Sequence, residues 1–249
     1  MNFFKPLSRF YFSGGENIKK FITEELSRYS PNEKDSMIYA TDNMILIGKI
    51  AGFLGDDKFA KLANDFFSDD PLHSSIIWRI HILSWAIESC KNLEGDFIEF
   101  GCYDAKVAEF LINYNNIKNF KKSFYLYDAF ENPPTTKGEK HSANLFSEVS
   151  DRLKKYDFVK IIPGLLPDTF KNNIPKKISF VHLDLNSADT ELSLIKLFFE
   201  RLVSGGIIIL DDYGTMFYEE QYYKEKDFFS NLGYSVLELP TGGGMVIKR

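Results

Sequence analysis

The sequence predicts an α/β fold built on a mostly parallel, doubly wound sheet. From Leu93 onward, short runs rich in β-branched and aromatic residues alternate with amphipathic stretches, which is the pattern of βαβ units. The last two runs are separated only by a short loop with Pro240 and Gly242, which is typical of an antiparallel hairpin. A chain of 249 residues is long enough for one large domain and too short for two full enzymatic domains.

The apolar runs after Leu93 predict a seven-stranded sheet. The expected strands are Phe97–Phe100, Ser123–Tyr127, Val159–Ile162, Ile178–Leu183, Gly206–Leu210, Ser235–Leu239 and Met245–Lys248. The expected helices between them are Lys106–Tyr114, Ala143–Tyr156, Ala188–Leu202 and Glu219–Leu232.

The part before Leu93 has a different pattern. From Glu33 to Asn92 the apolar residues recur at helical spacing and predict three helices, the first running from Met37 to Leu54 and the last starting after Pro71. We expect residues 1–92 to be an N-terminal arm and helical cap that also supplies a dimer contact. Residues 93–249 are then the core of one integrated domain.

Composition excludes several classes of protein. The 30 Lys+Arg and 35 Asp+Glu give a net charge of -5 without a basic stripe, so we expect no nucleic-acid partner. The two cysteines, Cys90 and Cys102, cannot build a disulfide framework, and no Cys/His spacing resembles a zinc site, so we expect a reducing cytoplasm. The best apolar stretch, Met44 to Leu54, is broken by Lys49 and is too short for membrane insertion.

Ligands of open α/β sheets bind beyond the carboxyl ends of the strands, and the first such end carries Glu99 and Gly101. The glycine permits a tight turn and close ligand approach, while Glu99 can pair with a cationic amine or accept from a hydroxyl. A purely structural turn explains the same residues. The turn lacks the further glycines of the dinucleotide fingerprint.

The next two strand ends suit a nucleoside. Asp128 follows Gly101 by 27 residues and is placed to hold ribose hydroxyls, although a solvated Asp that caps the next turn is the alternative. The third end, which starts at Gly164, offers an apolar edge that could cover an adenine, or it is a plain turn.

The fourth site is acidic. Asp184 ends one strand, and Asp211 and Asp212 end the next along the chain. If these strands are neighbours, three carboxylates converge, and a hard cation such as Mg²⁺ would relieve their repulsion. Capping and surface charge are the alternative. His182 lies on the same strand face as Asp184, so it can reach this site or simply pack in the core.

Taken together, the sequence resembles the S-adenosylmethionine-dependent O-methyltransferases similar to macrocin O-methyltransferase, which act on sugar hydroxyls. The stretches that carry the resemblance are Leu93–Gly101, Tyr127–Glu131, His182–Asp184, Gly205–Gly214, Leu239–Gly244 and the preceding helix Trp78–Ala86.

This resemblance implies a Rossmann-like class I methyltransferase fold and a sugar or glycan acceptor, with a homo-oligomer as a further expectation. It implies that S-adenosylmethionine is bound by Glu99, Gly101, Tyr103, Asp128, Ala129, Phe130 and Gly164. It also implies a divalent metal, Mg²⁺, on Asp184, Asp211 and Asp212, with Asp184 and His182 as catalytic residues.

Two departures from the family pattern keep other functions open. Asp104-Ala105 stands where the family has another glycine, and Asn186 replaces a second acid. These departures suit a degenerate methyltransferase fold that acts as a non-catalytic binding subunit. An NAD(P)-dependent oxidoreductase is the other alternative, because it would use the same ribose-binding acid, Asp128. The segment from Asn132 to His141 is expected to be either a lid over the acceptor or a linker.

Overall fold

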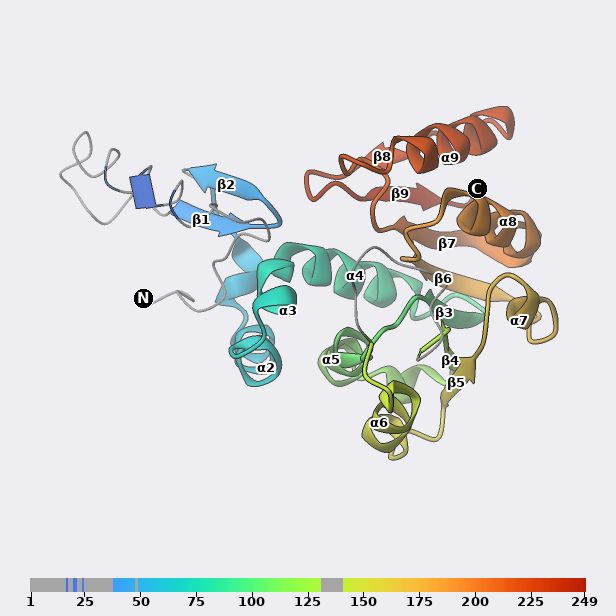
Figure 1. Ribbon diagram of the computed structural model, residues 1–249, viewed down its shortest axis with the longest axis horizontal. Helices are drawn as coiled ribbons and strands as arrows, with labels where there is room; N and C mark the ends of the chain where they lie inside the picture. The colour runs from blue at the N-terminus through green and yellow to red at the C-terminus, as the bar shows by residue number, and fades with distance from the viewer. Residues whose placement is uncertain (1–16, 18–19, 22–23, 25–37, 48, 131–140) are drawn as a thin grey trace. The chain divides into compact units, whose positions relative to one another are not determined.

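The computed structural model describes residues 17, 20–21, 24, 38–47, 49–130 and 141–249 (Figure 1). The chain divides into two compact units, Met1–Ser84 and Trp85–Arg249. The expected division between residues 92 and 93, with a cap over the sheet, stays a prediction. No helix among the described residues is long and apolar enough to span a bilayer.

The first unit contains a β-hairpin where the sequence pattern predicted a helix. Strands β1 (Ile38–Thr41) and β2 (Met44–Ile47) pair antiparallel, so the helical prediction from Met37 onward is wrong. Asp42 and Asn43 form the two-residue turn with φ of 46° and 56°, the conformation that suits the twist of a tight hairpin. Short polar side chains tolerate this backbone, and the β-branched residues on either side favour strands.

The helices of this unit follow the hairpin. They are η2 (Gly52–Gly55), α2 (Asp57–Phe67), α3 (Pro71–Ser75) and α4 (Ile77–Cys90), which runs into the second unit. Asp56 caps α2 by accepting from Phe59 N at 2.9 Å. Arg79 Nε donates to Asp42 Oδ1 at 3.2 Å, which ties α4 to the hairpin turn. The predicted helices near Phe59 and after Pro71 are confirmed.

The second unit is built on a seven-stranded sheet, as predicted. Its strands are β3 (Asp96–Phe100), β4 (Phe124–Asp128), β5 (Val159–Pro163), β6 (Ile178–Leu183), β7 (Leu202–Leu210), β8 (Leu237–Glu238) and β9 (Gly244–Ile247). Their order is β5-β4-β3-β6-β7-β9-β8, with β9 antiparallel to both of its neighbours and the pairs from β5 to β7 parallel. The strand order reverses between β3 and β6, so that point of the carboxyl edge is where a ligand is expected.

Helices cover both faces of this sheet. Figure 1 shows α5 (Lys106–Asn115) and α6 (Leu145–Leu153) on one side, and α8 (Ala188–Phe198) and α9 (Glu219–Asn231) on the other. Three short helices lie in the connections that lead to the next strand: η3 (Ile117–Phe120), α7 (Asp168–Lys171) and η4 (Phe199–Arg201). Phe198 and Phe229 from α8 and α9 pack into a buried cluster with alternate residues of the central strands, including Phe100 and Leu183.

Several element boundaries differ from the predicted ones, and those of β7 and β8 are examples. β7 begins at Leu202 rather than Gly206, because Leu202 pairs with Ile178 of β6. Further along the strand, Gly205 N donates to Lys248 O at 2.7 Å and Lys248 N donates back to Gly206 O at 2.8 Å. β8 covers two residues rather than the predicted five.

Candidate active site

The strand ends that were singled out in the sequence meet at one edge of the sheet. Backbone hydrogen bonds extend the ladder by one residue there: Gly101 N donates to Tyr127 O at 2.8 Å and Gly164 N donates to Asp128 O at 2.9 Å. On the other side of β3, Asp184 N donates to Phe100 O at 2.9 Å, and Asp211 N donates to Leu183 O at 3.0 Å. The residues after β3, β4, β5, β6 and β7 therefore stand side by side.

Gly101 follows β3 directly and lies against the backbone that follows β6. Its φ is +86°, and a Cβ built on it would lie 1.7 Å from the carbonyl O of Asp184. Only glycine fits this position, because the backbone of Asp184, directly after β6, passes against its α-carbon. Gly164, with φ of +138°, is similarly crowded by Thr169 Oγ1 at 2.4 Å.

The turn after Gly101 keeps a glycine-like backbone without glycine. Tyr103 has φ of 46° and Ala105 has φ of 55°, so two ordinary residues occupy the left-handed region. Ala105 is the N-cap of α5 and is buried. The turn thus keeps a left-handed conformation although the glycine expected from the family pattern is missing. Tyr103 and Ala105 adopt this conformation at a steric cost.

Asp128 holds this turn in place. Its Oδ2 accepts from Tyr103 N at 2.8 Å, and its Oδ1 accepts from Phe130 N at 2.6 Å. Burial raises the pKa of the Asp128 carboxyl, and the two backbone N–H groups and nearby His141 oppose that rise. The predicted ribose-binding acid therefore also organises the loop that faces it.

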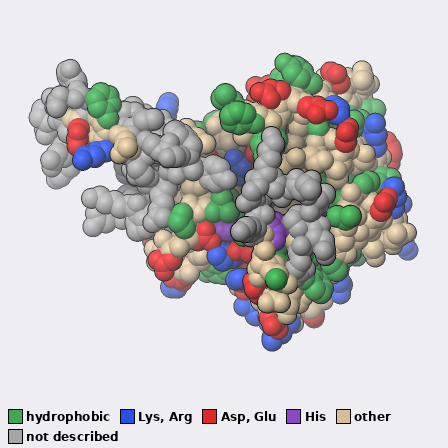
Figure 2. Space-filling view, in the orientation of Figure 1, with side chains coloured by type: hydrophobic (Ala, Val, Ile, Leu, Met, Phe, Trp, Pro, Cys, Tyr) green, Lys and Arg blue, Asp and Glu red, His purple; other side chains and the backbone are tan. Residues whose placement is uncertain are grey.

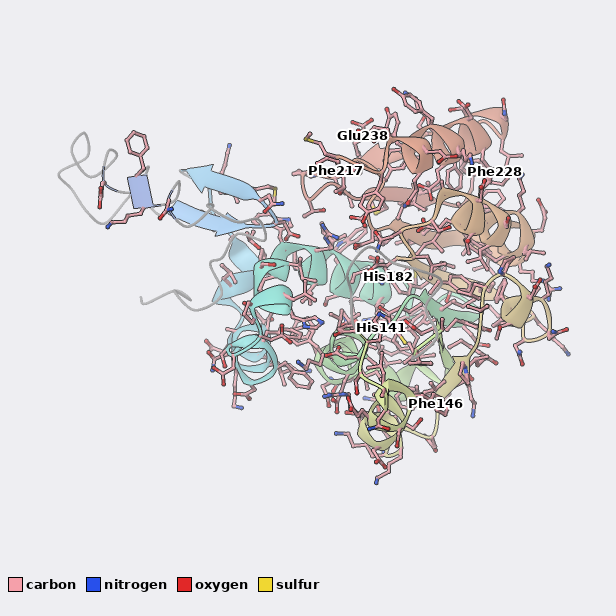
Figure 3. All side chains as sticks on the ribbon, in the orientation of Figure 1. His141, Phe146, His182, Phe217, Phe228 and Glu238 are labelled. Atoms are coloured by element: carbon pink, nitrogen blue, oxygen red, sulfur yellow. The ribbon has the colours of Figure 1, made fainter. Side chains whose placement is uncertain are left out.

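His141 belongs to the same corner and was not singled out in the sequence. Its ring lies 5.2 Å from that of Tyr103, and its Nδ1 is 2.5 Å from Phe130 O. Figure 3 labels His141 together with His182 in the second unit. Phe130 itself is buried and packs on Phe146 at 5.3 Å, while Ala129 is half-buried. Of the expected lid, residues 132–140 lie outside the described residues.

A chain of three side chains crosses the neighbouring strands β3, β6 and β7. Glu99 Oε1 is 3.0 Å from His182 Nδ1, and His182 Nε2 is 3.4 Å from Asp211 Oδ1. All three residues are buried. Strand register explains the contact, because Glu99 is paired with His182 and Asp211 lies two residues beyond Ile209, the β7 partner of His182.

The surroundings of His182 favour its charged form. Burial lowers the pKa of the imidazole, but the hydrogen bonds to Asp211 and Glu99 outweigh that effect and raise the pKa to about 10. An imidazolium has no lone pair with which to accept a proton. In this arrangement Asp184 is the better candidate for a base than His182.

The acidic end of the site offers ligands for a cation. Potential ligand atoms of His182, Asp184 and Asp211 lie within 4.8 Å of one another. Asp212 is not part of that group; its charge instead acts on Glu191 and Glu225. Asn186 is exposed and adopts φ of 55°. The structure thus brings two of the three predicted metal ligands together with His182.

Two buried glutamates lie behind this end of the site. Glu191 on α8 accepts from Leu185 N at 3.0 Å and from Gln221 Nε2 at 2.8 Å, so it supports the loop after Asp184. Burial raises its pKa to about 7. Burial and the neighbouring Glu191 raise the pKa of Glu225 further, so the pair shares a proton near neutral pH.

We expect Glu225→Gln to stabilise the protein at alkaline pH. A raised carboxyl pKa contributes stability that is complete below the ordinary value of 4.5 and is lost as the pH rises through the raised value, which is about 7 for Glu191 and is also raised for Glu225. The amide at position 225 keeps a donor for Glu191 and has no proton to lose, so the free energy of unfolding of the variant should exceed that of the wild type at about pH 8. Urea unfolding across this pH range, with exposed Glu220→Gln as control, measures the effect. An unchanged pH dependence would show that the pair does not titrate as described.

The outer surface has mixed charge. On the face seen in Figure 2, Lys and Arg side chains are interspersed with Asp and Glu. The absence of a nucleic-acid partner stays a prediction.

A family model shows the family of this chain, and similar solved structures show its fold. The sequence model described as macrocin-O-methyltransferase (TylF) matches residues 77–229. Among curated proteins, the chain has no significant match. The similar solved structures include the O-methyltransferase NovP, which has a TM-score of 0.57 and 14% identity over 70% of this chain and 81% of NovP.

Two further structures extend the likeness. The S-adenosylhomocysteine-bound methyltransferase PaMTH1 of Podospora anserina has a TM-score of 0.58 and 16% identity, over 97% of this chain and 99% of that one. CalS11, a TDP-rhamnose 3'-O-methyltransferase of calicheamicin biosynthesis, has a TM-score of 0.55 and 13% identity, over 77% of this chain and 93% of that one. At these identities the structures show the shared fold.

Proposed function

Because the chain belongs to the macrocin-O-methyltransferase (TylF) family of O-methyltransferases, we propose that it transfers a methyl group from S-adenosylmethionine to a hydroxyl of a sugar or glycosylated acceptor, assisted by a divalent cation. The observation that carries the proposal is the family match, which spans Glu99, Asp128, Asp184 and Asp211. The likeness to CalS11, a TDP-rhamnose 3'-O-methyltransferase, supports a sugar acceptor.

The cofactor end of the site fits a positively charged amino acid. Among the described residues, Glu99 Oε2 is a buried oxygen without a hydrogen-bond partner. Such an oxygen is costly unless something donates to it, and the ammonium group of the methionine moiety is a suitable donor. Asp128 would take the ribose hydroxyls, and Tyr103 and Gly164 would border the nucleoside. When bound, S-adenosylmethionine supplies the electrophilic methyl group.

The acidic end fits a hard cation. Asp184 and Asp211 offer carboxylate oxygens, the ligand type that Mg²⁺ prefers, and His182 stands beside them. When bound, the cation would lower the pKa of a hydroxyl that it coordinates.

The residues of the chain then have distinct tasks in the reaction. The hydroxyl that attacks must lose its proton, and Asp184 can accept it because it is half-buried at the edge and carries a lone pair. Glu99 and Asp128 orient the cofactor, while the tied strand ends fix the distance between cofactor and acceptor. Positioning and proton removal are therefore the work of residues on adjacent strands.

We expect Asp128→Ala to weaken S-adenosylhomocysteine binding. The loss of charge-assisted contacts to the ribose should cost about 1.5–3 kcal/mol of binding free energy. Calorimetry measures it. Asp128→Asn removes the charge and, with its single amide oxygen, can keep only one of the contacts to Tyr103 N and Phe130 N, so we expect it to weaken binding as well. Exposed Asp157→Ala serves as control. Unchanged affinity in Asp128→Ala would remove Asp128 from the cofactor site.

The test of the function as a whole is a methyl-transfer assay with S-adenosylmethionine on nucleotide sugars, polysaccharides and glycosylated natural products. We expect transfer with Mg²⁺ and its loss with EDTA. Activity that survives chelation would contradict the role of the cation but would still support the methyltransferase activity. Cofactor binding without turnover on any acceptor would favour the non-catalytic alternative, and NAD binding would favour an oxidoreductase.

A further inference from the structure

The side chains of Glu99, His182 and Asp211 form a hydrogen-bonded row. This row connects the cofactor end of the proposed site to its acidic end. Glu99 has one oxygen on His182 and the other buried without a partner among the described residues. Asp211 contacts the opposite ring nitrogen of the same histidine and contributes to the group of potential cation ligands. One buried imidazole thus touches both the carboxylate assigned to the cofactor and a carboxylate assigned to the metal.

We propose that His182 is a positioning residue that couples cofactor binding to cation binding through its two ring nitrogens. The inference rests on the proposed function and assigns to His182 a task other than proton transfer. The ring fixes the Glu99 carboxylate from one side and the Asp211 carboxylate from the other. Because the ring is bonded to both carboxylates, a change at one of them alters the hydrogen bond that the ring makes with the other.

The geometry supports this task over that of a free ligand or base. Both ring nitrogens already face a carboxylate oxygen, at 3.0 Å and 3.4 Å. His182 is only 5% exposed, so its ring has little room to turn toward another group. Its backbone is held between β3 and β7 by the parallel ladders. Partners that orient a metal ligand from behind commonly change metal affinity about 10- to 100-fold when removed.

The decisive variant is Glu99→Gln, which leaves every potential cation ligand in place. We expect it to weaken Mn²⁺ binding about tenfold through the altered contact with His182. The same substitution in a His182→Asn background should change Mn²⁺ affinity by less than about twofold, because the connection is already broken. Asparagine retains a donor near the Nδ1 position, toward Glu99, and removes the contact to Asp211.

Mn²⁺ affinity is measured by electron paramagnetic resonance on the full chain, and S-adenosylhomocysteine affinity by calorimetry, for the wild type and each variant. The matched control is Glu109→Gln, which should leave Mn²⁺ affinity unchanged. Glu109 is a buried glutamate of α5 that contacts Lys155 and Tyr156, which follow α6. Should His182→Asn fail to fold, Asp211→Asn provides the reciprocal test: we expect it to weaken S-adenosylhomocysteine binding severalfold although Asp211 is assigned to the other ligand.

Several results would overturn the coupling. One is an unchanged Mn²⁺ affinity in Glu99→Gln, and another is the absence of Mn²⁺ binding by the wild type. A third is an equal effect of Glu99→Gln in the wild-type and His182→Asn backgrounds, which would indicate direct electrostatics between Glu99 and the cation. An unchanged S-adenosylhomocysteine affinity in Asp211→Asn would also overturn the coupling. Failure of the wild type to bind S-adenosylhomocysteine would instead contradict the proposed function.

Discussion

Asp184→Asn is expected to lower kcat for methyl transfer at least about 100-fold, since the substitution removes the group that accepts the proton of the acceptor hydroxyl and one of the two carboxylates offered to the cation. Asparagine has nearly the same size, and the hydrogen bond from the backbone N of residue 184 to Phe100 O does not involve the side chain. The fold and S-adenosylhomocysteine affinity should therefore be preserved. A steady-state assay together with calorimetry separates loss of chemistry from loss of binding.

The control for this substitution is Asp189→Asn. Asp189 lies on α8 with its side chain 87% exposed and pairs with Lys224, so neutralising it should leave kcat unchanged. If Asp184→Asn retains activity close to that of the wild type and of the control, another group accepts the proton, and Asp211 is the next candidate.

Gly101→Ala is expected to have the largest effect on stability. The added methyl group would lie 1.7 Å from the carbonyl O of Asp184, a backbone atom that cannot move without breaking the β3–β6 ladder. Steric overlap and the unfavourable φ of +86° together should lower the free energy of unfolding by on the order of 3 kcal/mol or more. Thermal and urea unfolding measure the loss.

Gly214→Ala is the matched control from the same edge. There the nearest atom to an added Cβ is Gly242 O at 3.5 Å, an ordinary contact. We expect a melting temperature close to that of the wild type. Equal stability of the two alanine variants would mean that the approach of β3 to Asp184 is looser than described.

The sequence pattern predicted the sheet but missed the N-terminal hairpin for an identifiable reason. The apolar residues Met44, Ile45 and Ile47, with Ile50 and Leu54, fit helical spacing as well as they fit strands. Asp42-Asn43 was the overlooked signal, since two residues that tolerate positive φ mark a tight turn. In the second unit, the alternation of strands with longer helices left less ambiguity.

Individual site positions were easier to predict than their contacts. Asp128, Asp184 and Asp211 could be placed at strand ends, because apolar runs end there. The contact of His182 with Glu99 depends on which strands are neighbours, and the sequence does not state strand order. Glu191 and Glu225 were missed because charged helix residues normally face solvent, whereas both are 0% exposed.

The position of β9 has a consequence for the order of folding during synthesis. β9 follows β8 in the chain yet lies between β7 and β8, so β8 reaches the sheet only through a strand that is made after it. Until then β7 has one unpaired edge. The loop after Asp211 is also held from this side, because Gly214 N donates to Gly242 O at 2.6 Å. A nascent chain can therefore assemble β3, β4 and the cofactor turn early, while the loop beside the acidic end is fixed only after the hairpin of β8 and β9 has emerged.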